Sequence, residues 1–470
     1  MSLAEQCLKW GVEELARRVQ SSGLRAHDVA QAFCDRIDAI NPKLNALIGY
    51  DRALVMAESD AVDQRIAAGE SLPLAGVPIT VKDNIWVKGR RIAQGSRLFE
   101  SFIAPRDAWA VARLRERGAV VLGITNCSEF ACKGVTTNML YGVTHHPDDV
   151  ALTPGGSSGG AASATAAGLG LAALGTDAGG SIRRPAAHCG VIGLKPSSGL
   201  VPHPWGFAEP NFGVSVIGVL ARRAQDCVAV FREMIAFDAG DPAGVPIGFD
   251  SGDWNAPLAS SLRLAWSPKL GCGFPVDHDV MAQFEAVVKR LQVAGWSIEQ
   301  ADPRWPDGTH TYPLLALQQA GLFALYGSRS AAERAMIDPD LNAQIDAGAT
   351  IDGSAVAETV RRREPIVRAL QNFFDRYDLL LTPAAPVTAW PWHTVPKTIG
   401  GEPVGPRGHA AFTPLFNYCG VPACTVPAGR VRGLPVGLQV VGRRFDDALV
   451  MRAVAKIESL IEAMVSVDRQ

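Results

Sequence analysis

The chain has 470 residues, a formal net charge of -2 and a pI of about 6.5, so it has no basic surface of the kind that nucleic acids or anionic membranes attract. Hydrophobic residues make up 47% and charged residues 20%, as in an ordinary globular protein. Residues 1–10 lack the pattern of a signal peptide, and the small apolar run over residues 161–175 is broken by Gly, Ser and Thr. We therefore expect a cytoplasmic protein that binds neither nucleic acid nor membrane.

The nine cysteines show no paired spacing, which favours reduced thiols over a disulfide framework. Four residues separate Cys127 from Cys132, and four separate Cys419 from Cys424, but no further metal ligand lies near either pair. Since a free cysteine behaves as a small hydrophobic residue, we interpret these four as core thiols. We expect neither a metal nor a cofactor.

The first elements expected along the chain are helices. Residues 11–40 are predicted to form two amphipathic helices, divided at residues 21–23, and Asn41-Pro42 is expected to end the second. A further helix is predicted over residues 51–68, closed by Gly69.

From residue 77 onward, short apolar strands alternate with helices. The predicted strands are residues 77–81, 119–123, 171–174, 262–266, 296–299, 379–382, 422–427 and 436–441, and the predicted helices are residues 107–117, 161–167, 280–291, 359–377 and 448–464. This alternation is typical of parallel strands with crossover helices, and it predicts one α/β domain. Residues 239–261 and 383–411, rich in Pro and Gly, are expected to be long loops of the kind that often carries function.

A serine ends the glycine-rich turn Gly175-Thr-Asp-Ala-Gly-Gly-Ser181. The turn follows a predicted strand and leads into a helix start, where Pro185 fits the first turn. Its successive N–H groups can point into one concavity, and such a nest suits a developing oxyanion. A tight turn that needs glycines only for space explains the segment equally well.

A second serine, Ser157, lies in the glycine-rich segment before the predicted helix over residues 161–167. Its simplest interpretation is an N-cap. A loop of this kind also cradles phosphate in some proteins, but the terminal Gly-Lys-Ser/Thr of that motif is absent.

Lys82 follows an apolar strand and precedes Asp83. A lysine that acts as a base near neutral pH needs a pKa well below its usual value of about 10.4. A lysine at a strand end that reaches water, or that pairs with Asp83, is the simpler alternative. Brought together, Lys82 and the two serines would supply a nucleophile and a base without histidine.

These segments together resemble the amidase signature family. The resemblance rests on Pro154-Gly-Gly-Ser-Ser-Gly-Gly160, Gly175-Thr-Asp-Ala-Gly-Gly-Ser-Ile-Arg183, Gly190-Val-Ile-Gly-Leu-Lys-Pro196, Gly76-Val-Pro-Ile-Thr-Val-Lys-Asp-Asn84, Thr125-Asn126 with Glu129-Phe130, and Gly433-Leu-Pro-Val-Gly-Leu-Gln439. It covers roughly residues 11–240 and 374–460. It implies a single domain with a mixed, mostly parallel sheet covered by helices on both faces.

The resemblance also implies site residues. Ser181 corresponds to the nucleophile, Ser157 to a proton-bridging serine with a cis peptide, and Lys82 to the base. The N–H groups of Ala178, Gly179, Gly180 and Ser181 correspond to the oxyanion hole. In such a relay the lysine gains partners and each serine gains a base.

Four residues are expected to support this site: Ser158 near Lys82, Thr176, and an ion pair of Asp177 with Arg183. Malonamidase-like members hold a substrate carboxylate with an arginine three positions after the nucleophile, which here is Arg184. A structural salt bridge of Arg184, for example to Glu209, is the alternative. His145, His146 and His188 are expected to be packing or surface residues.

The resemblance implies a stand-alone amidase that hydrolyses a carboxylic acid amide, with a small amide as its partner molecule. The alternative is the A subunit of a glutamyl-tRNA amidotransferase, which feeds ammonia to a partner. That subunit usually carries a Tyr-Asp-Ala-Tyr-Tyr segment, which is missing from residues 348–363. A non-catalytic protein of the same fold would have lost a triad member, and all three are present. A homodimer is compatible with the sequence.

The expected organisation within the domain is N-terminal helices over residues 1–70, a catalytic core over 71–240, a variable substrate region over 241–375, and C-terminal strands with a helix over 376–470. An aromatic pocket lining would suit an aryl or other apolar group. The candidates for such a lining are Trp205, Phe207, Phe212, Tyr312, Leu317, Phe323, Trp390, Trp392 and His393, and packing roles explain each equally well.

Overall fold

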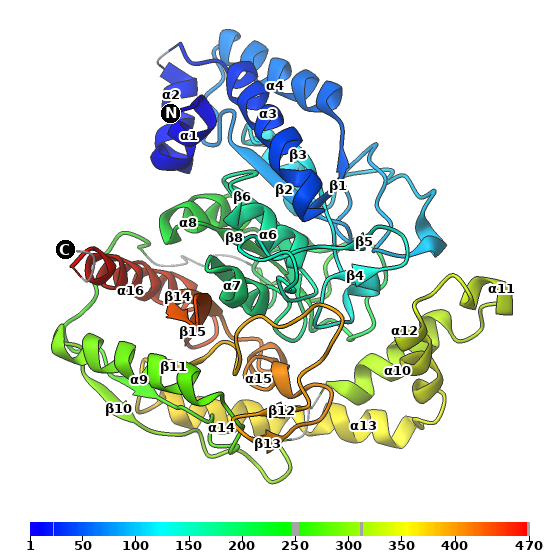
Figure 1. Ribbon diagram of the computed structural model, residues 1–470, viewed down its shortest axis with the longest axis vertical. Helices are drawn as coiled ribbons and strands as arrows, with labels where there is room; N and C mark the ends of the chain where they lie inside the picture. Colours follow the sequence, from blue (N-terminus) through cyan, green and yellow to red (C-terminus); the bar gives the residue numbers. More distant parts are fainter. Residues whose placement is uncertain (22, 247–252, 311–313, 468–470) are drawn as a thin grey trace.

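One sheet organises the part of the chain that the computed structural model describes, residues 1–21, 23–246, 253–310 and 314–467. Its strands lie in the order β1-β3-β2-β6-β8-β7-β14-β15-β11-β9-β10 (Figure 1). Their bounds are β1 Leu47–Tyr50, β2 Pro78–Lys82, β3 Val120–Thr125, β6 Ala172–Asp177, β7 Ile192–Lys195, β8 Val216–Ala221, β9 Leu264–Trp266, β10 Ile298–Gln300, β11 Leu379–Pro383, β14 Ala423–Val431 and β15 Leu434–Val441. Because early and late strands share this sheet, the chain forms a single domain.

The helices and small elements complete the domain. The α-helices are α1 Leu3–Trp10, α2 Val12–Ser21, α3 Ala26–Leu44, α4 Arg52–Ala67, α5 Trp109–Glu116, α6 Gly159–Ala166, α7 Arg183–Cys189, α8 Ala224–Arg232, α9 His278–Val293, α10 Leu315–Tyr326, α11 Ala331–Arg334, α12 Pro339–Gly348, α13 Gly353–Arg361, α14 Arg363–Phe374, α15 Pro414–Tyr418 and α16 Asp447–Val467. Short 3-10 helices lie at Arg97–Phe99, Glu129–Ala131 and Gly408–Ala410, and the pairs β4 (Thr137–Asn138) with β5 (Gly142–Val143) and β12 (Thr398–Ile399) with β13 (Glu402–Pro403) form two small sheets.

The sheet is mixed. Strand β2 pairs in parallel with β3 and β6, and β9 pairs in parallel with β10 and β11. The strands between these two parts pair antiparallel, from β6 through β8, β7, β14 and β15 to β11. A tight turn at Arg432-Gly433 joins β14 to β15, and so short a connection makes an antiparallel pair. The expected α/β class, with a mixed sheet covered by helices, is confirmed.

Helices cover both faces of the sheet. Ala173 of β6 and its partner Leu220 of β8 pack in one cluster with α6 and α7. The neighbouring pair Leu174 and Val219 belongs to the main core instead, because successive side chains of a strand point to opposite faces. Helices α8 and α16 contact each other on that second face, where Ala224 N donates to Glu458 Oε2 at 3.0 Å.

Glycines let α7 approach the sheet closely. A Cβ on Gly193 of β7 would lie 2.5 Å from the Cβ of Ala186, and one on Gly437 of β15 would lie 2.7 Å from that of Ala187. These strands therefore hold α7, and the turn that precedes it, against the backbone of the sheet.

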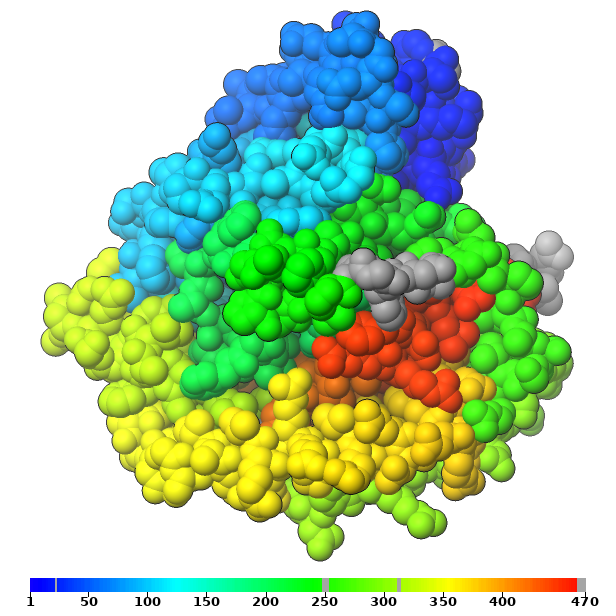
Figure 2. All heavy atoms as spheres, turned by 180° about the vertical axis from the view of Figure 1, so that it is seen from behind, coloured from blue at the N-terminus to red at the C-terminus, as the bar shows by residue number. Residues whose placement is uncertain are grey.

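The two ends of the molecule are built from different parts of the chain. The N-terminal helices α1 to α4 lie at one end, and α13 with α14 lies at the other (Figure 1). From behind, the same two ends appear in blue and yellow, and red C-terminal residues reach the surface between green and yellow segments (Figure 2).

Two predicted helix boundaries are wrong. Helix α3 continues through Pro42 to Leu44, and Asn45 caps it in the left-handed conformation. The side chain of Asn41 then accepts bonds from the N–H groups of Ala46 and Leu47, which fixes the chain just beyond the helix end. The single helix expected over residues 359–377 is two helices, α13 and α14. Pro365 lies in the first turn of α14, where a missing N–H is tolerated, but it cannot continue the ladder of α13.

Most other predicted elements agree with the structure, but several of its elements had no prediction. Helix α4 and the predicted strands appear within a few residues of their expected bounds. The elements that had not been predicted include α1, α8, α10, α11, α12, α15, β1, β7 and β8. All nine cysteines are free. No helix in the described ranges combines the length and apolar character needed to cross a membrane.

Candidate active site

Lys82 is the last residue of β2, and its side chain is fully buried. Its Nζ donates to three hydroxyl groups: Ser157 Oγ at 2.7 Å, Ser158 Oγ at 2.9 Å and Thr176 Oγ1 at 2.9 Å. Ser158 was expected near Lys82, and Thr176, expected only to support the site, contacts the same amine. Thr176 also accepts a bond from Asn84 at 3.0 Å, which fixes its hydroxyl beside the amine.

The surroundings of Lys82 make its amine a usable base. Burial lowers the pKa of Lys82 to about 8, although nearby Cys127 and Asp177 act in the opposite direction. No carboxylate in the described residues forms an ion pair with it. A substantial fraction of Lys82 is therefore neutral just above physiological pH.

Asp83 does not pair with Lys82. Its carboxylate instead accepts bonds from the N–H groups of Ala93 and Gly95, both at 2.8 Å. Burial raises the pKa of Asp83 to about 7. The alternative in which Lys82 is a surface lysine, or a partner of Asp83, does not describe this structure.

Ser157 and Ser158 lie on a buried loop before α6. The Gly156–Ser157 peptide is cis. The N-cap of α6 is Ser158, and not Ser157 as the simplest interpretation of the sequence had it. Ser158 N donates to the carbonyl of Ser181 at 3.1 Å, so the two serine-bearing loops touch through their backbones.

Ser181 lies in the turn between β6 and α7, and it is 7% exposed, whereas Ser157 and Ser158 are 0% exposed. Among these three serines, Ser181 is thus the one with some exposed surface. The turn requires a glycine at position 180, because Gly180 has φ +110 and a Cβ there would lie 2.1 Å from Thr413 Oγ1.

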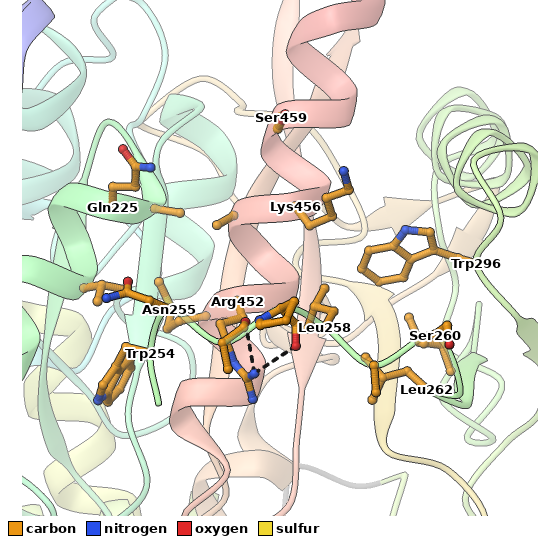
Figure 3. A pocket seen from close by; sticks show the side chains of 18 of the residues that line it. Gln225, Trp254, Asn255, Leu258, Ser260, Leu262, Trp296, Arg452, Lys456 and Ser459 are labelled. Carbon is orange, nitrogen blue, oxygen red and sulfur yellow. Dashed lines mark hydrogen bonds between the residues drawn. The ribbon is translucent and has the colours of Figure 1, made fainter. Parts of the chain in front are cut away.

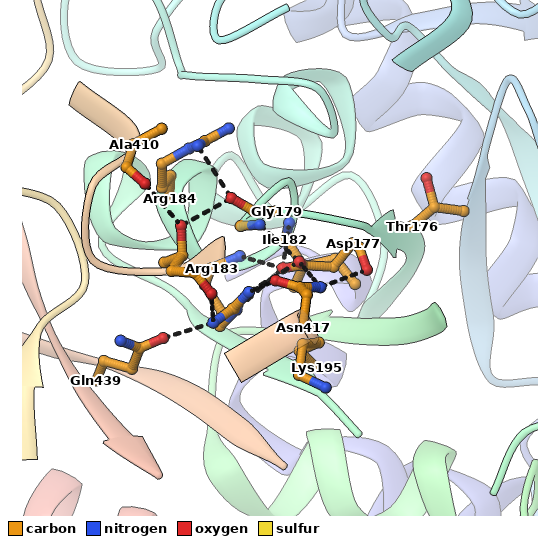
Figure 4. A network of polar contacts seen from close by, with 12 residues as sticks. Thr176, Asp177, Gly179, Ile182, Arg183, Arg184, Lys195, Ala410, Asn417 and Gln439 are labelled. Carbon is orange, nitrogen blue, oxygen red and sulfur yellow. Dashed lines mark hydrogen bonds and ion pairs between the residues drawn. The ribbon is translucent and has the colours of Figure 1, made fainter. Parts of the chain in front are cut away.

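A buried ion pair of Asp177 and Arg183 supports this turn, as expected (Figure 4). Arg183 Nη2 lies 2.9 Å from Asp177 Oδ1, and both side chains are fully buried. Burial alone would raise the pKa of Asp177, but the charge and hydrogen bonds of Arg183 hold it well below its usual value. The pair is therefore ionised, and it ties the end of β6 to the start of α7.

The C-terminal part of the chain supplies further partners that sequence reasoning missed. Arg183 Nη1 donates to Gln439 Oε1 at 2.7 Å, and Asn417 Nδ2 donates to Asp177 Oδ1 at 2.8 Å. Thr413 Oγ1 donates to the carbonyl of Gly179 at 2.8 Å. Gln439 belongs to the motif Gly433-Leu-Pro-Val-Gly-Leu-Gln439, whereas no sequence motif links residues 413 and 417 to the turn.

The N–H groups of the turn are not equivalent. Gly180 N donates to Asp177 Oδ1 at 2.7 Å and is already engaged. The N–H groups of Ala178, Gly179 and Ser181 donate to no acceptor within the residues that the structure describes. These three are the ones available to a ligand oxygen.

Arg184 bridges the two serine-bearing loops. Its Nη1 donates to the carbonyl of Gly179 at 3.1 Å and its Nη2 to that of Gly156 at 3.2 Å, and its side chain is 4% exposed. Glu209, the suggested partner, instead accepts bonds from the N–H groups of Asn211 and Gly213. These contacts favour a positioning role for Arg184, and a contact with a substrate carboxylate stays a prediction.

The histidines take the structural roles expected for them. His146 and His188 are buried, and a ring nitrogen of His146 bonds the carbonyl of His188 at 2.8 Å. Burial lowers the pKa of His188 to about 3, which makes it a very weak base. His145 bonds the carbonyl of Val150.

The aromatic pocket candidates mostly pack elsewhere. Trp390 lines a cavity, whereas Phe207 packs with Trp86, Phe99 and Phe102. Trp205 donates to the carbonyl of Asp107, Leu317 belongs to the core, and Trp392 packs against His393. Phe212 and Phe323 are exposed, and Tyr312 lies outside the described residues.

Two cavities differ in their relation to this site. One, of about 640 Å³, lies along α16, with Trp254 on one side of the helix and Trp296 on the other, and with Arg452 and Lys456 in its wall (Figure 3). It lies over the face of the sheet that α8 and α16 cover, away from α7. The other, of about 820 Å³, is bounded by residues 132–135 and by the loop that contains His409, and its wall residues Gly134 and Val135 pack against Gly156 of one serine loop. In the described residues, no group of His, Cys, Asp and Glu side chains could hold a metal ion.

A buried lysine joined to serine hydroxyls, beside a nest of free N–H groups, is an arrangement suited to nucleophilic attack on a carbonyl carbon. The family model described as Amidase matches residues 28–451, so the chain belongs to the amidase family and is a hydrolase of amides.

Relatives of known function agree with this assignment. The chain is 33% identical to an acylamidase of Rhodococcus erythropolis, with 97% of each protein covered. It is also 33% identical to the A subunit of a glutamyl-tRNA(Gln) amidotransferase from Roseiflexus castenholzii, with 93% of this chain and 92% of that protein covered. The crystal structure of a bacterial aryl acylamidase of the amidase signature family is similar, with a TM-score of 0.88, 28% identity and 96% of each chain covered.

Proposed function

We propose that this protein hydrolyses a linear carboxylic acid amide to the acid and ammonia or an amine, with Ser181 as nucleophile, Ser157 as proton relay and Lys82 as base. The observation that carries the proposal is the 2.7 Å bond from Lys82 Nζ to Ser157 Oγ in a fully buried setting. The related acylamidase and the similar aryl acylamidase structure support it.

In the first half-reaction, neutral Lys82 accepts the proton of Ser157, and Ser157 accepts that of Ser181. Ser181 Oγ forms a bond to the amide carbon, and the carbonyl electron pair moves onto oxygen. When this intermediate collapses, the C–N bond breaks, and the nitrogen leaves with the proton returned through Ser157. The product of this half is an acyl group on Ser181.

In the second half-reaction, water attacks the acyl carbon and gives its proton to the same relay. The C–O bond to Ser181 breaks, and the serine recovers its proton. The oxyanion of both intermediates would be held by the turn of residues 178–181. Since Gly180 N is engaged by Asp177, the donors we propose are the N–H groups of Ala178, Gly179 and Ser181.

The ammonia-supplying member of a glutamyl-tRNA amidotransferase complex is the competing function, because relatives of that kind match nearly as much of the chain as the acylamidase does. Its activity needs partner proteins, whereas the proposed amidase acts alone. Purified chain incubated with a panel of amides, and separately with glutamine, therefore separates the two functions. Ammonia release from glutamine only when partner proteins and tRNA are added would replace the proposal.

The nucleophile is tested by Ser181→Ala. The change should lower kcat/KM roughly 10⁴-fold or more, leaving only the slow hydrolysis that substrate binding and the oxyanion site support. A fluorophosphonate reagent should label the peptide that contains Ser181. Labelling at Ser157 or Ser158, with Ser181→Ala still active, would rule out the assignment.

A further inference from the structure

The cavity of about 820 Å³ is walled in part by segments that contact the two serine loops. Gly134 and Val135 line it, and a Cβ on Gly156 would lie 2.8 Å from the backbone of both residues. On its other side, the segment that supplies His409 to the wall continues to Thr413, which bonds the carbonyl of Gly179. Two segments of the cavity wall thus contact the loops that carry Ser157 and Ser181.

The cavity wall is largely apolar. Its apolar side chains come from four separate segments and include Phe274, Leu315, Trp390, Val395, Val404 and Leu415. Trp390 packs against the ring of His409 at a centroid distance of 5.2 Å. An apolar wall with aromatic side chains favours an apolar ligand group.

The charged groups at this wall are engaged with protein partners. Lys133 Nζ lies 3.0 Å from Asp340 Oδ2 and also pairs with Asp338. Arg407 donates to Gln344 Oε1 at 3.0 Å and to the carbonyl of Cys132 at 3.2 Å. Burial lowers the pKa of His409 well below its usual value, so its ring is neutral at physiological pH. A neutral ligand group fits these walls better than an ionised one.

The volume of the cavity also favours a bulky ligand group. Ligand sites of about 300–1,000 Å³ hold molecules much larger than acetamide. We propose that this cavity holds a bulky apolar group of the substrate, aryl or branched alkyl, so that the enzyme selects amides with such a group over small aliphatic ones. This inference rests on the proposed function and names the substrate class of the same site.

Hydrolysis by the purified full chain tests the selection. The substrates are acetamide, 4-nitroacetanilide, which carries its aryl group on the amine side, and 4-phenylbutyramide, which carries it on the acyl side. At least one aryl amide should have a kcat/KM about 100-fold above that of acetamide, within the range that apolar pockets achieve. The aryl amide that is preferred tells which side of the scissile bond enters the cavity. Equal values for acetamide and both aryl amides would overturn the inference.

Helix α10 offers a matched set of variants. Gln319 of α10 lines the cavity, and Ala324 of the same helix is exposed. Gln319→Trp should lower kcat/KM for the preferred aryl amide about tenfold and leave acetamide within about twofold. Gln319→Ala and Ala324→Trp should leave both substrates nearly unchanged. Equal loss on both substrates in Gln319→Trp would contradict the cavity assignment.

A probe that cannot be hydrolysed separates this inference from the proposed function. 4-Phenylbutan-2-one should bind Ser181→Ala protein in calorimetry and bind several-fold more weakly when Gln319→Trp is added. Turnover of amides without such binding would overturn the cavity assignment alone. Binding at the cavity without turnover of any amide by the wild-type chain would overturn the proposed function instead.

Discussion

Two buried lysines end strands of the same sheet, and their surroundings separate their roles. Lys82 ends β2 and Lys195 ends β7. The pairing through β6 and β8 makes these strands point the same way, so both lysines lie at one edge. Both side chains are fully buried, and burial lowers the pKa of both.

Their hydrogen-bond partners differ. Lys82 donates to three hydroxyl groups, which can pass protons. Lys195 donates to the carbonyl of Pro196 at 2.7 Å, a group with no proton to pass, and the charge of Arg183 lowers its pKa further. A lowered pKa therefore does not distinguish the two lysines, whereas the hydroxyl groups around Lys82 are what the proposed proton relay requires.

The same substitution at both lysines tests this contrast most strongly. Lys82→Met should reduce kcat/KM by roughly 10⁴-fold or more, because no other group replaces the base. Lys195→Met keeps the volume and should leave activity within about threefold and the free energy of unfolding within about 1.5 kcal/mol. Both are measured with the best amide of the panel and by urea unfolding.

The relay supplies the control for that experiment. Lys82→Ala and the double variant Lys82→Ala/Ser157→Ala should be almost equally inactive, because residues that act as one unit are strongly non-additive. Losses that multiply would give Lys82 and Ser157 independent roles.

Asp177 ends β6, which lies between the strands of the two lysines, and its substitution tests the buried ion pair with Arg183. Asp177→Asn should lower the free energy of unfolding by about 3–5 kcal/mol, since it leaves the buried charge of Arg183 without its partner. Chemical denaturation with the wild type as reference measures the loss. A change below about 1 kcal/mol, the usual value of an exposed pair, would show that the pair adds little to the turn.

The pH dependence sharpens the role of Lys82. In the proposed mechanism the neutral form of Lys82 is the base, so kcat/KM should rise with pH up to a pKa of about 8 and fall about tenfold per pH unit below it. Asp177 raises the pKa of Lys82, so Asp177→Asn should move the rising part of the pH profile to lower pH. If this rising part moves in Asp177→Asn but not in Lys195→Met, the titration belongs to Lys82. A flat profile between pH 6 and 9 would remove Lys82 as the base.

The smallest expected effect concerns Arg184 and Thr413, which both hold the carbonyl of Gly179. Arg184→Leu or Thr413→Val should lower kcat about tenfold with little change in KM, since each removes hydrogen bonds that fix the turn. Neutral and carboxylate-bearing amides should lose activity equally. A rise of KM confined to carboxylate-bearing amides in Arg184→Leu would instead make Arg184 a substrate contact.

The sequence by itself determined which residues make up the candidate site, because short motifs carry local geometry. The glycines around Ser157 and Ser181, and the lysine at the end of an apolar strand, were enough to predict loops at sheet ends. Alternation of apolar strands and helices was likewise enough to predict the α/β class. The sequence predicted helix boundaries less well, since Pro42 is tolerated near the end of α3 and Pro365 marks the start of α14.

Only the tertiary structure decided which distant groups meet. It joined Lys82 to Ser157 across 75 positions of sequence, and Thr413 and Asn417 to a turn more than 200 positions away. It also engaged the N–H of Gly180 with Asp177, and the guanidinium of Arg184 with two backbone carbonyls. The physical reason is that strand order brings the ends of non-consecutive strands to one edge, and no local pattern in the sequence encodes that order.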